Sequence, residues 1–343
     1  MAGAELMKWA LLHEYPGNEL ELKWREFLER ADFPAHYVAP EYFLEPFFRG
    51  KGPFAVLARH DDRIVGVVTG IHEHGQVMCG QKSRPQTCVD ESADPSIVAA
   101  GLAGGLIEEA GSEALITLFT WAPVDKLLTS GYRREDQEGV VMLDLTRGPE
   151  ALLKDFSANR RTNVRSAMKR GIEVAPATTR EEFQAYYEVY AHWCARKDQE
   201  TLRYETFEEA LMLTKNRRLF LARFEGKVIA GVVLRVYPQG MIEYAANSSF
   251  EQDLKLKPND LLHWRVIEWA CSEGYTRYNL AGAHLFLRKM GGTIQPVYRY
   301  RLDRTWLRRH ELKEALGQSG RKIFRALPEG VRKQVKRALK RDE

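Results

Sequence analysis

Two stretches of this 343-residue chain read as the same hairpin. Phe54 to Val68 reads FAVLARHDDRIVGVV, and Leu219 to Val233 reads LFLARFEGKVIAGVV. Each begins with an apolar run, passes a polar turn and ends in a β-branched run, which is the pattern of two antiparallel strands joined by a tight turn. The copies lie about 164 residues apart. Since this is nearly half the chain, the sequence predicts an internal duplication.

The segments on either side of the hairpin also recur. Downstream, a third strand is followed by a helix that begins with proline and then by a fourth strand. Upstream, aromatic and aliphatic residues at helical spacing predict a helix in each half. The matched segments are 19–30 with 181–197, 76–79 with 241–244, 95–110 with 258–273, and 114–121 with 277–281. A single repeat this long predicts two copies of an α/β domain with a mixed sheet, because solenoid units run to only roughly 20–50 residues.

The composition is that of a folded protein without a membrane span. Hydrophobic residues make up 44% and charged residues 29%, which excludes the disordered and fibrous classes. No apolar run approaches the roughly 20 residues of a spanning helix, and the first 15 residues lack a signal-peptide pattern. Four cysteines without a CxxC pair favour reduced thiols over a Cys79–Cys88 disulfide. We therefore expect a cytoplasmic protein.

The net charge of +4 conceals an uneven distribution. Residues 304–343 carry 13 Lys and Arg against 5 Asp and Glu, net +8, so the other 303 residues carry 38 against 42, net −4. Aliphatic residues recur every four positions from Leu327 to Leu339, which predicts a basic amphipathic helix. An RNA contact, an anionic membrane surface and a solvated helix packed on the body are the three alternatives for this tail.

A basic segment joins the two copies. Ser157 is a suitable helix N-cap and Gly171 a suitable stop, and Arg161, Arg165 and Lys169 follow one another at i, i+4 and i+8. The predicted division of the chain is then a first domain at 1–148, a connecting basic helix at 149–172, a second domain at 173–303 and a basic helical tail at 304–343.

Several segments, in this order, resemble the Fem-type (FemAB-like) proteins. They are Asn159–Gly171, Pro258–His263, Gly274–Gly282 and Phe286–Gly292, the last leading into Tyr298–Tyr300. In the order of its elements the resemblance covers residues 20–303. It implies two tandem GNAT-like domains of the α/β class with mixed sheets. It also implies an acyltransferase that moves an acyl or aminoacyl group from a thioester or ester to an amine.

The sequence departs from the family at two positions. Relatives carry an aromatic–lysine pair shortly before the Gly-Gly, and here Leu287 stands in place of the lysine. Arg288 and Lys289 beside it are the candidate substitutes. The Asp often found at the end of the preceding strand is Asn279 here. A non-catalytic binding protein on a decayed transferase fold is therefore an open alternative.

Acyl transfer to an amine needs reactants held in line, backbone N–H groups for the developing oxyanion and a proton for the leaving group. We expect strands 241–246 and 277–281 to part and so supply these groups. The candidate catalytic residues are Tyr244 as proton donor, Asn279 as a hydrogen-bonding group and His284 as general base. The alternatives are a tyrosine packed under a helix, a turn-forming asparagine and an exposed loop histidine.

The candidate substrate-binding residues are polar or basic groups at the same strand ends and on the connecting helix. They are Asn247, Asn259, Arg288, Lys289, Arg161 and Arg165. Alternatively, Asn259 only helps to start the helix that follows it. Glu243 precedes Tyr244 and points to the other face of the strand, where we expect a solvated charge or a salt-bridge partner.

The expected donor depends on the residues before the helix at Pro258. Coenzyme A-dependent GNAT enzymes carry a Gln/Arg-x-x-Gly-x-Gly/Ala loop there, whose amides bind the pyrophosphate. This chain reads KLKPNDLL from Lys255 to Leu262, without glycine. The glycines of segment 95–110 fall inside a predicted helix and indicate close packing. Aminoacyl-tRNA is therefore the expected co-substrate, ahead of acyl-CoA, with no permanently bound cofactor and no metal.

The expected function is an N-acyltransferase that moves an aminoacyl group from charged tRNA, or an acyl group, onto an amine. An acyl-CoA-dependent GNAT N-acetyltransferase is the alternative enzyme. The expected partners are tRNA, an amine-bearing small molecule, peptide or cell-wall precursor, and a membrane surface at the basic tail; a monomer is expected. The second half is expected to hold the site, because the last strand of the first half, at 115–121, is mostly apolar.

Overall fold

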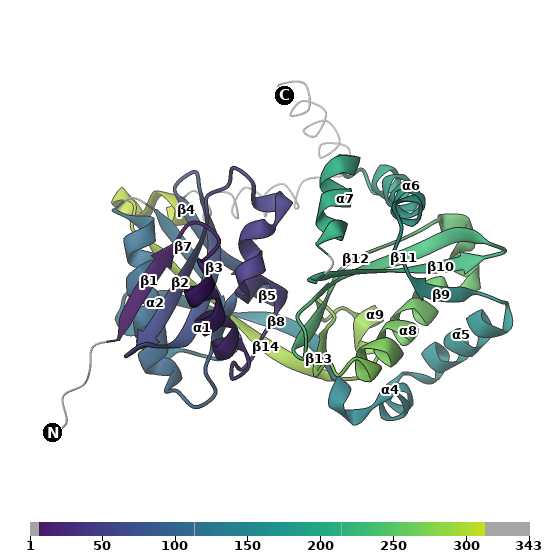
Figure 1. The fold of residues 1–343 in the computed structure, drawn as a ribbon, viewed down its shortest axis with the longest axis horizontal. Helices are drawn as coiled ribbons and strands as arrows, with labels where there is room; N and C mark the ends of the chain where they lie inside the picture. Colours follow the sequence, from purple (N-terminus) through teal and green to yellow (C-terminus); the bar gives the residue numbers. More distant parts are fainter. Residues whose placement is uncertain (1–6, 113, 214, 313–343) are drawn as a thin grey trace, which may run out of the picture.

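The computed structural model describes residues 7–112, 114–213 and 215–312. In this part of the chain, fourteen strands form one mixed sheet that passes through two α/β halves lying side by side (Figure 1). The α/β class and the duplication predicted from the hairpins are both confirmed.

The first half carries a helix on each face of its sheet. Its strands are β1 (Lys8–Leu12), β2 (Pro53–His60), β3 (Arg63–Glu73), β4 (Gln76–Gln81), β5 (Arg84–Pro85), β6 (Thr87–Val89) and β7 (Leu115–Thr120). Its helices are α1 (Asn18–Leu28), α2 (Pro95–Ala110) and α3 (Asp125–Thr129), with the short 3-10 helices η1 (His36–Val38), η2 (Pro40–Leu44) and η3 (Pro46–Phe48). Successive strand residues point to opposite faces. Ala55 and Leu57 therefore pack with α1, and Phe54 and Val56 with α2.

The second half repeats this arrangement. Its strands are β9 (Glu173–Pro176), β10 (Arg217–Phe224), β11 (Lys227–Val236), β12 (Met241–Ser249) and β13 (Arg277–Asn279). Its helices are α4 (Pro149–Asp155), α5 (Ala158–Lys169), α6 (Arg180–Arg196), α7 (Tyr204–Met212), α8 (Pro258–Ser272) and α9 (Leu285–Arg288), with the 3-10 helices η4 (Leu145–Arg147) and η5 (Glu251–Leu256). Helices α6 and α7 cover one face of the sheet, and α4, α5 and α8 cover the other (Figure 1).

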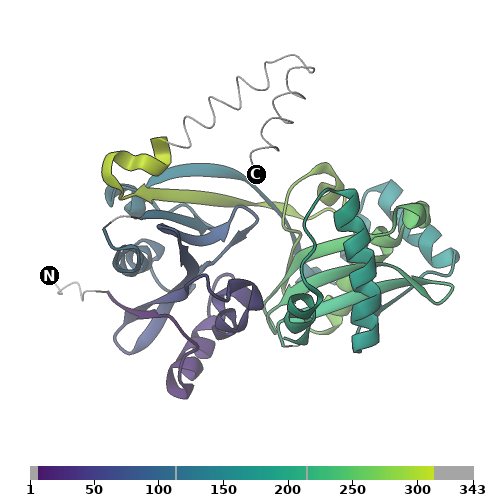
Figure 2. The same cartoon turned by 90° about the horizontal axis from the view of Figure 1, so that it is seen from above.

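Two long strands are exchanged between the halves. They are β8 (Arg133–Asp144) and β14 (Thr293–Asp303), which pair antiparallel from Arg133–Arg301 to Met142–Thr293. The end of β8 pairs with β13 of the second half, whereas the end of β14 pairs with β7 of the first. The strand order is β1-β2-β3-β4-β7-β14-β8-β13-β12-β11-β10-β9, with β5 paired to β4 and β6 paired to β3 beside this path. Both strands run from one half into the other in the turned view of Figure 2. β8 thus belongs in sequence to the predicted first domain (1–148) but pairs with β13 of the second half, and β14 belongs to the predicted second domain (173–303) but pairs with β7 of the first.

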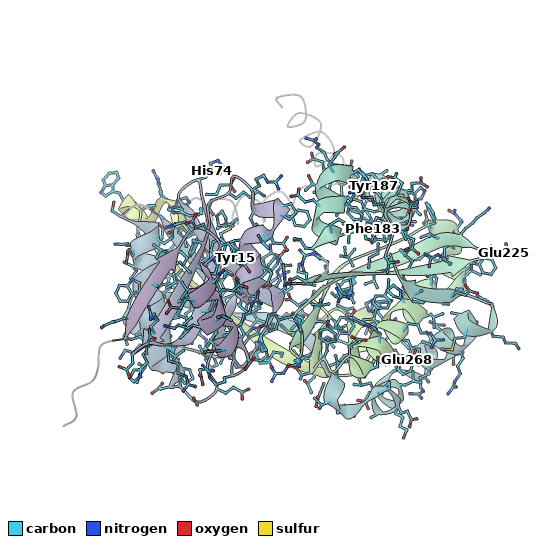
Figure 3. All side chains as sticks on the ribbon, in the orientation of Figure 1. Tyr15, His74, Phe183, Tyr187, Glu225 and Glu268 are labelled. Atoms are coloured by element: carbon cyan, nitrogen blue, oxygen red, sulfur yellow. The ribbon has the colours of Figure 1, made fainter. Side chains whose placement is uncertain are left out.

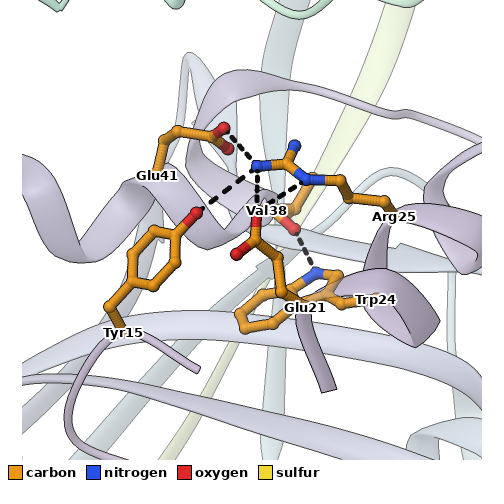
Figure 4. Close-up of polar contacts among 6 residues, drawn as sticks. All are labelled: Tyr15, Glu21, Trp24, Arg25, Val38 and Glu41. Atoms are coloured by element: carbon orange, nitrogen blue, oxygen red, sulfur yellow. Dashed lines mark hydrogen bonds and ion pairs between the residues drawn. The ribbon is translucent and has the colours of Figure 1, made fainter. Parts of the chain in front are cut away.

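The segment between α1 and β2 is tied to the first half by polar contacts (Figure 4). The indole N–H of Trp24 donates to the Val38 carbonyl at 2.9 Å. The Arg25 guanidinium forms ion pairs with Glu21 at 2.7 Å and with Glu41 at 2.6 Å. These contacts hold η1 to η3 in a defined position, which matters because this segment packs against the second half.

Most sequence-predicted elements are present at their expected places. The hairpins are β2–β3 and β10–β11, and the second turn has positive φ at both Glu225 and Gly226. The helices predicted at 95–110 and 258–273 are α2 and α8. Close packing of the α2 glycines is confirmed, because a Cβ added at Gly105 would lie 2.3 Å from Cγ1 of Val56. The strands predicted at 76–79 and 241–244 are longer than expected.

The predicted connecting helix consists of two helices, α4 and α5. Ser157 caps α5, its hydroxyl oxygen accepting from the Arg160 amide at 3.4 Å, and Gly171 follows the helix with a φ of +79°. The tail predicted from Arg304 opens with the 3-10 helix η6 (Trp306–Arg308). Its predicted basic amphipathic helix lies outside the described residues.

The described part of the chain contains no helix with the length and hydropathy of a membrane span. The four cysteines are all free thiols, and Cys79 and Cys88 are buried separately. The prediction of reduced thiols is therefore confirmed.

Candidate active site

The two middle strands of the second half run parallel and then part. β12 pairs with β13 from Met241–Arg277 to Glu243–Asn279, and β12 alone continues to Ser249. Residues 241–243 are buried, whereas 244–247 are partly exposed. We call the opening between residues 244–249 of β12 and residues 280–284 the wedge, and the Glu243–Asn279 pair its apex.

Both sides of the wedge have a backbone feature that separates them. On β12, Tyr244 is opposite Leu234 and Ala246 is opposite Val233, so Ala245 is the extra residue of a β-bulge. On the other side, Ala281 has a φ of +58°, and the chain beyond Asn279 follows β8 instead of β12. The predicted parting of the strands is therefore present.

In the first half, the chain itself fills the corresponding place. β4 and β7 pair up to Cys79–Leu118, and at Gly80 (φ +90°) the chain leaves β4. It folds back as β5 and then returns beside β3 as β6, where the Thr87 hydroxyl donates to the Phe119 carbonyl at 3.1 Å. Residues 80–86, which we call the excursion, thus occupy the first-half opening.

The α8 face of the wedge is lined by aromatic side chains. The Tyr244 ring lies 5.3 Å from the imidazole of His263, and burial raises the pKa of Tyr244 to about 12. Nδ1 of His263 is 3.0 Å from the Tyr278 hydroxyl, and burial lowers the pKa of His263 to about 3. Tyr244 therefore keeps its proton at neutral pH next to an uncharged imidazole.

A buried ion pair fixes the floor of this face. Arg160 of α5 pairs with Asp260 in the first turn of α8, and it also donates to the Phe286 carbonyl at 2.7 Å. Its guanidinium lies 3.5 Å above the Phe286 ring, and Asn163 donates to the same Asp260 carboxylate at 3.0 Å. These contacts join α5, α8 and α9. Arg161 and Arg165 of this helix were predicted to bind substrate, whereas the buried Arg160 was not.

Asn279 is completely buried and both ends of its amide are engaged. Its oxygen accepts from the Ala281 N–H at 2.8 Å, and its nitrogen donates to the Ser83 carbonyl of the excursion at 3.0 Å. These contacts are those of the turn-forming alternative, because they hold Ala281 in its left-handed conformation. Asn279 therefore shapes the apex of the wedge.

The other candidates lie in or near α9, directly after residues 280–283 on one side of the wedge. His284 is exposed, precedes α9 and stacks on Phe286 with ring centroids 6.2 Å apart. Arg288 donates to the Ala283 carbonyl and to Glu138 at 3.2 Å, and Lys289 is exposed. Leu287, in the place of the family lysine, is only 2% exposed and belongs to the core.

The Gly-Gly that follows α9 is required by backbone geometry. Gly291 and Gly292 have φ values of +77° and +78°. A Cβ on Gly292 would lie 2.5 Å from the carbonyl oxygen of Met142 on β8. These two residues therefore let β14 begin directly beside β8.

Three candidate binding residues make structural contacts. Asn247 donates to the Gly231 carbonyl at 2.9 Å, and Asn259 accepts from the Ser249 hydroxyl at 2.8 Å. Arg161 donates to the Lys154 carbonyl at 2.9 Å, in the last turn of α4. Arg165, by contrast, is exposed on α5.

Glu243 differs from the expectation of a solvated charge or salt-bridge partner. Its side chain is 1% exposed, and neither carboxylate oxygen has a hydrogen-bond partner in the described residues. It points to the face of β12 opposite Tyr244, beneath the first half, and burial raises its pKa. The expectation was wrong because the sequence does not show that the first half covers this face. A carboxylate at the last paired position before a parting of strands is the signal that could have found it.

Exposed basic side chains lie on α5 and on the segments next to its two ends. We call this set the basic rim: Arg165, Lys169, Arg170, Lys255, Lys257 and Lys289. The rim is continuous because Ser157, at the start of α5, donates to the Lys289 carbonyl at 2.9 Å, and Arg170, after its end, donates to the Lys255 carbonyl at 2.6 Å. Across the described ranges, no group of three or more His, Cys, Asp and Glu side chains could hold a metal ion.

Comparison with known proteins yields two family matches. Residues 86–212 match the model of the FemAB family, and residues 158–289 match the model of an acetyltransferase (GNAT) domain. No curated protein matches the sequence.

The fold is similar to several solved structures. FemX is 13% identical with a TM-score of 0.65, over 85% of this chain and 96% of FemX. L-PGS from Bacillus licheniformis is 16% identical with a TM-score of 0.54, over 84% of this chain and 92% of that one. A tandem GNAT protein from the clavulanic acid biosynthesis pathway is 12% identical with a TM-score of 0.53, over 87% and 98%. At these identities the likeness establishes the fold, and the predicted fold class is confirmed.

Proposed function

We propose that this chain, which matches the FemAB family model over residues 86–212 and the model of an acetyltransferase (GNAT) domain over residues 158–289, is an acyltransferase that moves an aminoacyl group from charged tRNA to an amine in the wedge. The observation that carries the proposal is the pair of neighbours at the apex. Glu243, a buried carboxyl without a hydrogen-bond partner in the described residues, and Tyr244 lie on opposite faces of the same strand. An acid and a base can thus act on the two sides of one reacting carbonyl.

The backbone of the wedge can stabilise the developing oxyanion. The bulge leaves Ala245 without a pair on β11, and past Glu243 the described chain places no strand against the other edge of β12. Backbone N–H groups of residues 244–247 that point into the wedge are therefore available to a carbonyl oxygen. Such preorganised donors usually supply the largest single contribution to acyl transfer.

Glu243 acts as the general base in this proposal. The acceptor arrives as an ammonium and must lose a proton before its nitrogen attacks. Burial raises the pKa of Glu243 above its ordinary value, which makes its carboxylate a stronger base than an exposed one. The ammonium first releases one proton to solvent to give the neutral amine, and the second proton passes from the nitrogen to Glu243 as the N–C bond forms.

Tyr244 acts as the general acid. When the tetrahedral intermediate collapses, the bond from carbonyl carbon to the leaving oxygen breaks, and the Tyr244 hydroxyl donates its proton to that oxygen. The pKa of about 12 keeps the phenol protonated until this step. The tyrosinate then regains a proton from solvent, and the product amide leaves with Glu243 ready to release its own proton.

Two features support charged tRNA as the donor. The segment before α8 is η5, which has no glycine, so the first turn of α8 lacks the glycine loop whose amides bind a pyrophosphate. The basic rim offers distributed positive charge of the kind that contacts a phosphate backbone. Under this proposal no cofactor is permanently bound.

The test is incubation of the full chain with a mixture of charged tRNAs and, separately, with acyl-CoAs, with product detected by mass spectrometry. We expect transfer from tRNA, a drop in kcat of about 10²-fold or more in Tyr244→Phe and Glu243→Gln, and no change in Tyr187→Phe. Tyr187 serves as the control because its hydroxyl donates to the Leu202 carbonyl. Tyr187 and Phe183 lie on α6, across the sheet from Glu268 on α8 (Figure 3). Full activity in both apex variants would contradict the proposal.

Two alternatives have specific support. The match of residues 158–289 to an acetyltransferase (GNAT) domain favours an acyl-CoA donor, and product from acyl-CoA but not from tRNA would select it. The buried Leu287 and the fully engaged Asn279 favour a binding protein on a decayed site. Binding of an amine without product from any donor would select that alternative.

A further inference from the structure

Glu243 belongs to a row of charged side chains that runs across the second-half sheet beneath the first half. Arg217 on β10 is opposite Arg235 on β11, and Arg235 is opposite Glu243 on β12. Residues directly opposite one another share a face of the sheet and have Cβ atoms about 4.5–5.5 Å apart. The three charges therefore lie side by side in a line that ends at the wedge apex.

The first half covers this row and neutralises only one end of it. Glu45 forms a buried ion pair with Arg217. Arg235 instead donates to the Tyr37 hydroxyl at 3.1 Å. Its guanidinium lies 5.0 Å from the centroid of the Tyr37 ring, and that of Arg84, from the excursion, lies 4.4 Å from the same centroid.

Near Glu243, both a hydrogen-bond donor and hydrogen-bond acceptors lack partners. Neither Arg84 nor Arg235 forms an ion pair within the described residues, and Nε of Arg84 has no hydrogen-bond partner there. Both oxygens of Glu243 likewise lack a partner. A buried polar group left unpaired costs about 1–3 kcal/mol, more when it is charged. Unpaired donor and acceptor atoms side by side beneath the wedge apex are the groups that a ligand carrying both charges could pair.

We infer that the acceptor carries an anionic group, a carboxylate or a phosphate, a few bonds from its amine, and that Arg84 of the first half helps to hold it. This inference rests on the proposed function, because it takes Glu243 as the group that receives the amine. The ammonium donates to the Glu243 carboxylate, and the anionic group accepts from Arg84 and Arg235.

The row explains why one molecule must carry both groups. An amine alone leaves the partly buried guanidiniums of Arg84 and Arg235 without an anionic partner, and an anion alone meets the Glu243 carboxylate. A site built to form hydrogen bonds rejects an analogue that lacks the partner group more strongly than an apolar pocket can reject a missing methylene. The spacing along the row limits the distance between the two charges of the acceptor to a few bonds.

The excursion delivers Arg84 to this place. The Ser83 carbonyl accepts from Asn279 at the apex, one residue before Arg84. The same seven residues that fill the first-half opening therefore contribute to the site of the second half. The first half is in this respect a source of specificity as well as a support.

The test measures binding to the full chain by isothermal titration, without any donor. The probes are matched amines with and without an anionic group: 4-aminobutyrate against butylamine, and phosphoethanolamine against ethanolamine. We expect at least one anion-bearing amine to bind tenfold or more tightly than its partner. The two pairs distinguish a carboxylate from a phosphate. We expect Arg84→Gln to reduce that ratio to threefold or less, whereas Arg203→Gln, at an exposed arginine next to α7, leaves it unchanged.

Several results would overturn the inference. It would be overturned by equal affinities within both pairs of probes, or by a lack of binding of all four probes. It would also be overturned by an affinity ratio that is unchanged in Arg84→Gln. Should thermal unfolding show that Arg84→Gln does not fold, Arg84→Lys replaces it, and we expect a reduced ratio because an ammonium cannot form the bidentate contact.

The outcome is separable from that of the proposed function. A tenfold preference in binding, together with no product from any donor, would support this inference and overturn the acyl transfer. Transfer to butylamine as fast as to 4-aminobutyrate, and to ethanolamine as fast as to phosphoethanolamine, would overturn this inference and leave the acyl transfer standing.

Discussion

Arg217, on a strand of the second half, donates to Glu45 of the first half, and the two side chains are 3% and 0% exposed. The same carboxylate also contacts the imidazole of His36, which is fully buried. A carboxylate and a guanidinium from distant parts of the chain are thus removed from water together. Each is tolerated in the interior because the other is present.

Removing one partner of this pair should therefore be costly. We expect Arg217→Met to lower the free energy of unfolding by about 3–5 kcal/mol, because Glu45 is left as an uncompensated buried charge. Arg49→Met is the matched control, since the Arg49–Glu209 pair also joins the halves but is exposed, and we expect a loss of about 1 kcal/mol or less. Urea unfolding monitored by circular dichroism measures both. Equal losses would contradict this account.

The transfer rate should depend on the ionisation of Glu243. Because burial raises the pKa of this carboxyl above 4.5, we expect kcat/KM to rise with pH until that pKa is passed and then to level off. Glu243→Gln should be slower by about 10²–10⁴-fold and should lack this ascending limb. Glu268→Gln, on the outer part of α8, should retain both rate and profile. An ascending limb that persists in Glu243→Gln would assign the titration to another group.

The same substitution should stabilise the protein at neutral pH. A carboxyl with a raised folded-state pKa opposes folding once it ionises in the unfolded chain, so stability is lost as the pH rises from 4.5 through the folded-state pKa. We therefore expect Glu243→Gln to have a higher free energy of unfolding than the wild type at pH 8 and no advantage at pH 4. Urea unfolding at the two pH values tests this, and an advantage of equal size at both would refute it.

His263 should contribute to acid unfolding. Burial lowers its pKa to about 3, so the folded chain keeps it neutral while the unfolded chain protonates it below about 6.5. Its contribution to stability is complete above pH 6.5 and falls by about 1.4 kcal/mol per pH unit as the pH decreases toward 3. We expect His263→Gln to remove this slope, whereas His74→Asn, at an exposed turn, leaves the pH dependence as it is. An unaltered slope in His263→Gln would be the contrary result.

Placing the lysine of the relatives at position 287 should not increase the rate of transfer. Leu287 is 2% exposed and packs in the second-half core, so Leu287→Lys would bury an unpaired ammonium. We expect a loss of about 3 kcal/mol or more in the free energy of unfolding and no gain in transfer. Leu285→Lys, two residues earlier and 69% exposed, should change stability by about 0.5 kcal/mol or less. A stable, faster Leu287→Lys variant would show that the position can turn toward the wedge.

The sequence predicted features that are set locally. The hairpin turn at Glu225 and Gly226, the Ser157 cap and the parting of the strands after Glu243 are each encoded within a few neighbouring residues. What sequence reasoning missed depends on partners far away in the chain. Glu243 was expected to meet water or a salt-bridge partner because nothing near it in sequence indicates that this face of β12 is buried beside Arg84 of the first half.

The same reason explains the other differences. β14 has the pattern of any buried strand, and only three-dimensional register shows that Tyr298 is opposite Thr120. Arg160, Arg161 and Arg165 look equivalent as letters on one basic helix. Burial distinguishes them, because Arg160 faces Asp260, Arg161 closes α4 and Arg165 faces solvent.

The exchange of β8 and β14 has a consequence for biosynthesis. The edge of β7 is unpaired until residues 298–303 have left the ribosome, since these residues are its partner on that side. The first half therefore cannot mature as an independent unit during translation, although nearly all of its sequence is made first. The nascent chain must keep an open strand edge protected while nearly all of the second half is synthesised.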